Sequence, residues 1–313
     1  MTAAASGGGD RPGAGFGAGC DAVDARKRAA SLAIWSRPVE PEPVGGGITN
    51  ANFLIDDGQR RCFVRVGHDI PVHHILRWHE LAASRAAHAA GISPAVLHAE
   101  PGVLVLDLVE GRTLAPEDVR QRRQLERIVP LLRRVHRELP LHLRGPSLVF
   151  WVFHLLRDYA GTLRDGGGRL VGALPDLLAR AERLERALGP VELVFGHNDL
   201  LAANLIDDGS RLWLVDWDYG GWNSPLFDLG GLASNSELPA ADRDWLLEAY
   251  LERPLDDGVR RSAQAMLTAS LLREAVWSMV SELHSTVDFD FVAYTAENLA
   301  RFELAWARFA AME

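Results

Sequence analysis

The sequence is poor in cysteine and has no long apolar segment. Its two cysteines, Cys20 and Cys62, lie outside any spacing that binds metal, so we expect free thiols in a reducing compartment. No apolar run approaches the roughly 20 residues that cross a bilayer, which argues against a membrane-spanning helix. The N-terminal residues lack the basic start and apolar stretch of a secretory signal. We therefore expect a cytoplasmic protein.

Lysine is rarer still: Lys27 is the only one, and the other 32 of the 33 lysines and arginines are arginines. This excludes a Walker-type phosphate loop, whose motif requires a lysine. The 33 lysines and arginines are outnumbered by 42 aspartates and glutamates, which gives a formal charge of −9. Such a protein is repelled by nucleic acid and by anionic membranes. We therefore expect a small-molecule partner, and neither nucleic acid nor membrane.

Three segments of different character follow one another along the chain. Residues 1–22 are rich in glycine and alanine, which predicts a disordered tail. Residues 23–110 alternate short apolar runs with glycine turns around one helical pattern that stops at Gly91, which predicts a small β-rich lobe. Residues 111–313 show mainly helical periodicity. The sequence therefore predicts an α+β protein of two lobes with a linker near Glu110, and a ligand site between the lobes.

The second lobe is expected to carry one polar hairpin among its helices. Apolar runs at residues 191–196 and 212–217 are typical of strands, and the polar residues 207–210 between them are typical of a turn. Asp207 and Asp208 are assigned to that turn. Helical patterns cover residues 148–163 and 174–188 and resume at about Pro239.

The predicted hairpin contains an ordered set of acidic and amide side chains. In "HNDLLAAN", Asp199 follows His197 by two residues and precedes Asn204 by five, and Asp216 closes the apolar run "LWLVD". Phosphoryl transfer uses an aspartate to accept the proton of the attacking hydroxyl. It also uses an asparagine and a second aspartate as oxygen ligands of Mg²⁺. The order and spacing therefore predict a kinase active site.

These motifs resemble the catalytic and metal-binding loops of the protein-kinase-like fold, and specifically the choline/ethanolamine kinase family of the aminoglycoside phosphotransferase-like superfamily. The resemblance extends from "GGGITN" to "ARFELAW" and implies a two-lobed protein-kinase-like fold with a mainly helical C-lobe. It implies that Asp199 is the catalytic base and that Asn204 and Asp216 bind Mg²⁺. Asp218 would bind a second metal or shape the first site.

Two further residues receive supporting roles from the resemblance. His197 would pack and hydrogen-bond behind the catalytic loop, and Asp228 in "SPLFDLGGL" would anchor that loop. An aspartate in the first turn of a helix, where it interacts favourably with the helix dipole, is a compatible alternative for Asp228.

For the co-substrate ATP, the resemblance implies a cation on the third strand and a carboxylate on the next helix. Since no lysine is available there, Arg65 takes this place with Glu80 as its partner; an exposed strand arginine and a solvated helix glutamate are the alternative. A glycine turn, "VGGGITNANF", would cover the phosphates, and the adenine would lie against the linker. The other nucleotide-binding residues implied are Gly46, Gly47, Thr49, Asn50, Leu108, Val109 and Glu110.

The residues predicted to bind the acceptor lie mainly in the C-terminal segment. By resemblance, Trp277 and Tyr294 occupy positions of an aromatic cage that holds a quaternary ammonium by cation–π attraction, and Trp222 would also face the acceptor. Glu274 fills a further cage position, and a carboxylate suits a primary amine comparably well. A place in the helix core is the alternative for Trp277.

The resemblance thus implies an ATP- and Mg²⁺-dependent phosphotransferase that phosphorylates the hydroxyl of a small cationic amino alcohol, choline first and ethanolamine second. An aminoglycoside kinase or another small-metabolite kinase, for example of thiamine, is the alternative within this class. A catalytically inactive kinase-like binding protein would not need the base, metal ligands and phosphate cation that are all present. A metal-dependent hydrolase would leave the first lobe unexplained. No pattern in the sequence indicates an oligomeric state.

Overall fold

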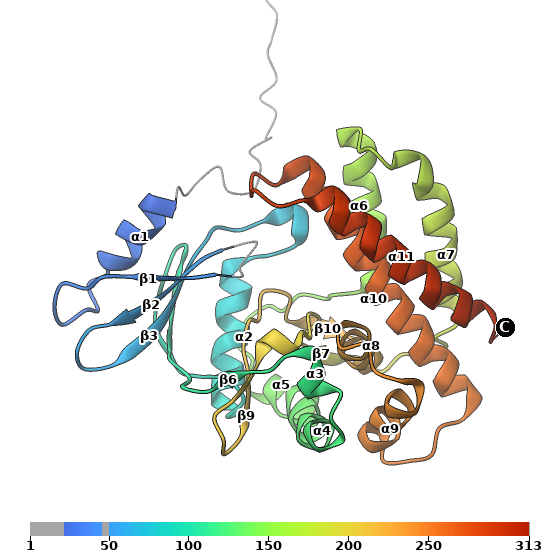
Figure 1. Cartoon of the computed structure of the whole chain (residues 1–313), viewed down its shortest axis with the longest axis horizontal. Helices are drawn as coiled ribbons and strands as arrows, with labels where there is room; N and C mark the ends of the chain where they lie inside the picture. Colours follow the sequence, from blue (N-terminus) through green and yellow to red (C-terminus); the bar gives the residue numbers. More distant parts are fainter. Residues whose placement is uncertain (1–21, 46–49, 313) are drawn as a thin grey trace, which may run out of the picture.

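The structure is a computed structural model that describes residues 22–45 and 50–312. Figure 1 shows a small lobe built on a sheet and a larger lobe of helices, which confirms the predicted two-lobed α+β fold. Of the predicted tail, only Ala22 lies within the described residues, where it begins helix α1 (Ala22–Ala30). Gly46, Gly47 and Thr49 of the predicted glycine turn also lie outside the described residues.

The small lobe is a five-stranded antiparallel sheet in the order β1-β2-β3-β5-β4. Successive side chains of a strand point to opposite faces. From β3, Cys62 and Val64 are buried in an apolar cluster with Ala25 and Ala29 of α1, so Arg65 points to the face that α1 does not cover. The strands are β1 (Glu42–Val44), β2 (Ala51–Asp56), β3 (Arg61–Val66), β4 (Val96–Glu100) and β5 (Val103–Asp107).

Helix α2 (Arg77–Ala89) joins the two lobes. Its residues Ala83, Ala86 and Ala87 are buried in the large apolar core of the second lobe. Gly91 follows the helix with a φ of +67°, a left-handed conformation that glycine adopts without steric cost and that commonly ends helices. The predicted helix and its glycine stop are confirmed.

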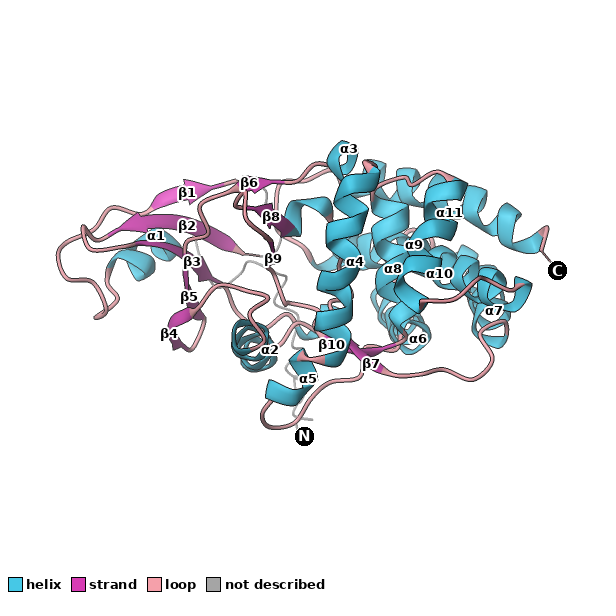
Figure 2. Ribbon diagram, turned by 90° about the horizontal axis from the view of Figure 1, so that it is seen from below, coloured by secondary structure: helices cyan, strands magenta, loops and turns pink. Residues whose placement is uncertain are grey.

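The second lobe packs its helices around α10 (Asp257–His284), which contacts α6, α7, α8 and α11. Figure 2 shows these helices gathered at the end of the molecule away from the sheet. Within residues 22–45 and 50–312, none of the helices combines the length and apolar character that crossing a bilayer demands. The other helices of this lobe are α3 (Pro116–Val119), α4 (Arg122–Arg137), α5 (Leu139–His142), α6 (Val152–Gly166), α7 (Leu174–Arg186), α8 (Pro225–Asn235), α9 (Ala240–Leu251) and α11 (Phe291–Ala310).

The prediction of a hairpin between residues 191–196 and 212–217 is wrong. The strand that pairs with β9 (Leu212–Leu214) is β8 (Leu205–Asp207), which also pairs with β6 (Arg112–Thr113). In contrast, β7 (Val194–Gly196) pairs with β10 (Gly221–Asn223). These strands span two or three residues, too few for periodicity to identify them.

A turn follows β8 as predicted, with Asp208 in it, whereas Asp207 is the last residue of the strand. Their carboxylates accept hydrogen bonds from the backbone N–H groups of Gly209 and Ser210, at 3.0 and 2.8 Å. Aspartates that bind the backbone two residues ahead are typical of tight turns.

The sequence indicated helix α8 only through the alternative for Asp228, which the structure does place in the first turn of a helix. Its extent was not predicted, because the segment "PLFDLGGLASN" holds two adjacent glycines that lower helix propensity. The structure explains one of them. A Cβ on Gly230 would lie 2.8 Å from the backbone nitrogen of Leu267 on α10, so only glycine allows the two helices to approach this closely. Ser224 caps the helix by accepting a hydrogen bond from the N–H of Leu226 at 3.3 Å.

His73 is a buried histidine at the end of the 3₁₀ turn Pro71–His73. Its ring stacks on Trp277 with 4.8 Å between centroids, and its Nε2 lies 3.0 Å from Ser281 Oγ. Burial, assisted by the charge of Arg273, lowers the pKa of His73 well below its ordinary value. Because the unfolded chain binds this proton below about pH 6.5, the stability contributed by the neutral ring is present above that pH. It is expected to fall as the pH drops, by up to about 1.4 kcal/mol per pH unit.

Urea unfolding at about pH 7.5 and about pH 5.5 measures this loss. His73→Gln is expected to reduce the difference between the two pH values by about 1 kcal/mol. His142→Gln, at an exposed histidine on α5, is the matched control and should behave like the original protein. Equal pH dependence in His73→Gln and the original protein would contradict the prediction.

Candidate active site

The loop that carries Asp199 is held between β7 and the 3₁₀ turn Ala202–Asn204. Asn198 has a φ of +63°, a left-handed conformation that asparagine tolerates better than most residues. Its Nδ2 donates hydrogen bonds to the carbonyl oxygens of Tyr219 and Gly221, at 2.9 and 3.0 Å. These bonds tie the loop to the segment around β10 and fix the position of Asp199.

Asp228, in the first turn of α8, holds the same loop from behind. Its two oxygens accept hydrogen bonds from the N–H groups of His197 and Asn198, at 2.8 and 2.7 Å, and Nε2 of His136 lies 3.0 Å away. Burial acts to raise the pKa of this carboxyl, but the hydrogen bond from His136 and the neighbouring histidines outweigh it, so the pKa is lowered. The buried His197 ring places its Nε2 2.9 Å from the carbonyl of Val215. This geometry fits the supporting roles expected of both residues.

The side chain of Asp199 is 28% exposed. Its Oδ1 accepts a hydrogen bond from Arg273 Nη2 at 3.3 Å. Burial raises the pKa of Asp199 to about 6, an effect that Arg273 opposes and Glu274 reinforces. The carboxylate is therefore ionised at neutral pH and still basic enough to accept a proton, as a general base must be.

Sequence reasoning missed Arg273, which connects these parts from α10. Its side chain is 5% exposed and donates to the carbonyl of Asn198 at 3.1 Å and to Glu274 Oε2 at 2.8 Å, besides its bond to Asp199. The guanidinium also lies over the Tyr219 ring, 4.9 Å from the centroid. The available signal was an arginine among the apolar residues of "SLLREAVW", since a buried arginine requires carboxylate partners.

Asn204, directly before β8, lies beside the segment that follows β9 and carries Asp216, because the N–H of Val215 donates to the carbonyl of Asn204 at 3.0 Å. The Asn204 amide Nδ2 donates to the carbonyl of Asp199 at 3.0 Å, which leaves its Oδ1 for a ligand. Asp216 has a φ of +71° and a side chain that is 35% exposed.

These two side chains offer an amide oxygen and a carboxylate oxygen, the hard ligands that Mg²⁺ takes. Over residues 22–45 and 50–312, no three histidine, cysteine, aspartate or glutamate side chains are grouped as a metal site of their own. A Mg²⁺ ion that keeps waters and nucleotide phosphates needs only one or two protein oxygens. The donors therefore fit a metal that arrives with a nucleotide.

Arg65 links the small lobe to the aspartates of the second lobe. Its Nη1 lies 2.7 Å from Glu80 Oε1, 2.8 Å from Asp216 Oδ1 and 2.6 Å from Asp218 Oδ1. Burial acts to lower the pKa of Arg65, but the three carboxylates raise it well above its ordinary value. Both Arg65 and Glu80 are buried, so the alternative of an exposed strand arginine and a solvated glutamate is wrong.

A second arginine, Arg77, was also missed, although it stands one turn before Glu80 on α2. Its Nη1 lies 2.9 Å from Asp218 Oδ1 and 2.7 Å from Glu80 Oε2, and its Nη2 donates to Asn50 Oδ1 at 2.6 Å. The other oxygen of Asp218 accepts a hydrogen bond from Asn50 Nδ2 at 3.2 Å. Both oxygens of Asp218 are thus engaged, and a metal bound there would have to replace one of these partners.

The linker residues Leu108, Val109 and Glu110 follow β5 directly. They line a cavity of about 250 Å³ together with Trp213 of β9. The N–H of Leu108 donates to the carbonyl of Arg61 at 3.2 Å, and the Glu110 carboxylate lies 2.9 Å from the Arg61 guanidinium. The linker is therefore held against the start of β3.

Two of the predicted acceptor residues lie together next to Asp199. Glu274 Oε1 accepts a hydrogen bond from the hydroxyl of Tyr294 at 2.8 Å, while its Oε2 binds Arg273. Phe289, which sequence reasoning missed, is 41% exposed and its ring centroid lies 5.5 Å from that of Tyr294. The result is a carboxylate bonded to Tyr294, with the Phe289 ring against that of Tyr294.

The two tryptophans are placed differently. Trp277 is 6% exposed and its Nε1 donates to the Tyr219 hydroxyl at 2.9 Å. It therefore lies in the helix core, which was the alternative to a role in the acceptor cage. Trp222 packs edge-on against Phe195, with 5.9 Å between ring centroids. In the described part of the chain, no hydrogen bond or ring contact joins Trp222 to Glu274.

Comparison with known proteins identifies the family. A model described as the phosphotransferase enzyme family matches residues 40–265. A crystal structure of a choline/ethanolamine kinase family protein from Mesorhizobium loti has a TM-score of 0.75 and 27% identity, covering 93% of this chain and 98% of that one. Ethanolamine kinase 2 of Mus musculus is 28% identical over 281 residues, 79% of this chain and 71% of that protein. Protein LicA of Haemophilus influenzae is 29% identical over 210 residues, which are 66% of this chain and 61% of LicA, so the match spans less than two thirds of that relative.

The matched region contains Asp199, Asn204 and Asp216, and it extends over both the sheet of the small lobe and the catalytic loop of the large one. The chain belongs to the phosphotransferase enzyme family.

Proposed function

We propose that the protein is an ATP- and Mg²⁺-dependent phosphotransferase that phosphorylates the hydroxyl of a small cationic amino alcohol, with choline and ethanolamine as the first acceptors to consider. The observation that carries this proposal is the shared guanidinium of Arg273, which lies 3.3 Å from Asp199 and 2.8 Å from Glu274. A base for a hydroxyl and an anionic site for an amine are thus held close together. This spacing suits a molecule with both groups on a short chain, and the relatives named as choline/ethanolamine and ethanolamine kinases support the same class.

In this reaction Asp199 accepts the proton of the acceptor hydroxyl while the hydroxyl oxygen attacks the γ-phosphorus of ATP and ADP leaves. Arg273 keeps the Asp199 carboxylate oriented toward the acceptor. On the nucleotide side, Arg65 and Arg77 provide guanidinium groups for the phosphates. Mg²⁺ held by Asn204 and Asp216 would neutralise the charge of the β- and γ-phosphate oxygens.

A coupled assay of ADP release tests the proposal against choline, ethanolamine, thiamine and an aminoglycoside. We expect turnover with choline or ethanolamine at a kcat/KM at least about tenfold above that of the other two acceptors, because each misplaced polar contact costs about 1.4 kcal/mol or more. Preference for an aminoglycoside or thiamine would support the alternative within the class. No turnover of any acceptor, together with no binding of Mg-ATP, would refute the phosphotransferase proposal.

The carboxylate Glu274 is expected to matter more for a primary amine than for a quaternary ammonium. Ethanolamine can donate charge-assisted hydrogen bonds to it, which contribute about 1.5–3 kcal/mol, whereas choline has no N–H. Glu274→Gln should therefore lower kcat/KM for ethanolamine by about 10–100-fold and for choline by less. Tyr294→Leu should show the reverse order, because a ring face attracts a quaternary ammonium.

Glu282→Gln is the control, since Glu282 lies on the same helix and pairs with the exposed Arg169 at 3.0 Å. Equal losses for the two acceptors in both variants would contradict the division of roles between carboxylate and ring.

A further inference from the structure

A second cavity, of about 240 Å³, lies between α8, α9, α10 and α11. Leu229, Gly230 and Ala233 of α8 line it, whereas Asp228 and Gly231 of the same helix line the space beside Asp199. At 3.6 residues per turn these two sets fall on opposite faces of α8. The cavity is therefore separate from the candidate active site.

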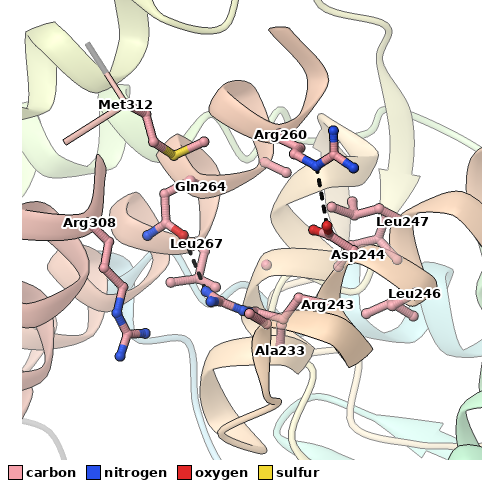
Figure 3. Close-up of a pocket in the computed structure, with 14 residues that line it drawn as sticks. Ala233, Arg243, Asp244, Leu246, Leu247, Arg260, Gln264, Leu267, Arg308 and Met312 are labelled. Carbon is pink, nitrogen blue, oxygen red and sulfur yellow. Dashed lines mark hydrogen bonds and ion pairs between the residues drawn. The ribbon is translucent and has the colours of Figure 1, made fainter. Parts of the chain in front are cut away.

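The polar groups of this cavity carry an excess of positive charge, shown in Figure 3. Three arginines line it but only one aspartate, and that aspartate, Asp244, is already paired with Arg260 at 3.2 Å. Arg243 donates to the neutral Gln264 Oε1 at 3.2 Å, and its buried Nε has no hydrogen-bond partner. Arg308 makes no ion pair or hydrogen bond within the described residues.

Arg243 and Arg308 approach the cavity from different helices, α9 and α11 (Figure 3). Burial, and after it the charge of Arg308, lowers the pKa of Arg243, so the two cations destabilise each other. A buried donor without a partner is also unfavourable. An anion between the two guanidinium groups would remove both the repulsion between the cations and the unpartnered donor. Guanidinium groups bind carboxylates and phosphates with two parallel hydrogen bonds.

The rest of the lining is apolar, with Leu246, Leu247, Leu267 and Met312 around the arginines (Figure 3). The cavity volume of about 240 Å³ leaves room for a short apolar chain. We propose that this cavity binds a small amphiphilic anion, with a carboxylate or phosphate monoester between Arg243 and Arg308 and a short apolar chain against the leucines.

Calorimetric titration of the full chain with hexanoate, hexyl phosphate and hexanol tests this, with Mg-ADP present so that the nucleotide site is filled. We expect the two anions to bind and hexanol not to, and the tighter anion identifies the natural head group as a carboxylate or a phosphate. Arg243→Gln and Arg308→Gln should each weaken binding by about tenfold or more. Arg85→Gln, at an exposed arginine of α2 without a described partner, should leave it unchanged.

Each test variant removes one of two like charges that line the same cavity, so without ligand we expect melting temperatures equal to or above that of the original protein. Arg308 is exposed and makes no described contact, so Arg308→Gln serves as the test if Arg243→Gln folds poorly. Absence of binding by both anions, binding of hexanol as tightly as hexanoate, or unchanged affinity in Arg308→Gln would overturn the proposal.

Discussion

Asp199→Asn is expected to lower kcat by about 10²–10⁴-fold, the range that a positioned general base contributes. The amide has the shape of the carboxylate and can still accept a hydrogen bond from Arg273, so the loop should keep its conformation. It cannot accept the proton of the acceptor hydroxyl. Because we propose that Asp199 contacts the acceptor and that Asn204 and Asp216 hold the Mg²⁺ of the nucleotide, the affinity for Mg-ATP should change little, and the loss should appear in kcat.

Steady-state kinetics, nucleotide binding by calorimetry and thermal unfolding measure the three quantities separately. Asp176→Asn is the matched control, since Asp176 is an exposed aspartate of α7 that pairs with a neighbouring arginine, Arg180, one turn along. It should retain full activity. If Asp199→Asn keeps kcat within about threefold of the original protein, a difference of less than 1 kcal/mol in the barrier, the assignment of the base is wrong.

Asp228→Asn is expected to lower the free energy of unfolding by about 3–5 kcal/mol, the usual result of breaking a buried charged network. Two backbone N–H groups and His136 converge on this carboxylate, which is 2% exposed. An amide at the same place would turn its own N–H₂ group toward one of those donors. The loss of an anchor for the N–H groups of His197 and Asn198 should also reduce kcat, because these residues fix the catalytic loop.

Urea unfolding at neutral pH measures the change, with Asp242→Asn as the control. Asp242 also pairs with an arginine, Arg122, at 2.6 Å, but near the surface, where such pairs contribute at most about 1 kcal/mol. Similar losses of stability in Asp228→Asn and Asp242→Asn would show that burial of the network has no special effect.

The sequence predicted the parts of the site that are fixed by local spacing. Asp199 and Asp216 follow β7 and β9 by two or three residues, and Asn204 directly precedes β8, so their spacing in the sequence was enough to recognise the motif. The prediction of the partners failed, because segments such as "LID" and "VFG" are extended only through contacts with residues distant in the chain. The pairing of Arg65 with Glu80 could be predicted because the resemblance requires a cation at that place on the third strand, where the sequence has Arg65 and no lysine.

The residues that sequence reasoning missed are defined by tertiary burial. Arg77 looks like the many exposed arginines of this chain until its carboxylate partners are known, and the apolar neighbours of Arg273 indicate burial without indicating its partners. Phe289 stands in a loop segment whose neighbourhood to Tyr294 depends on how α10 and α11 pack. Trp277 has the pattern of a core residue and is one, although the resemblance gave it a role in the acceptor cage.

The ion pairs of Arg65 hold the two lobes together. One guanidinium from β3 binds Glu80 of α2 and both Asp216 and Asp218 of the large lobe, so the lobes are fastened together before any nucleotide arrives. An entering phosphate would then replace a carboxylate at Arg65, and it would not need to bring two separate lobes together. Since the contacts of Arg65 and the burial of α2 in the large core both join the small lobe to the large one, we expect the two lobes to unfold in a single cooperative transition.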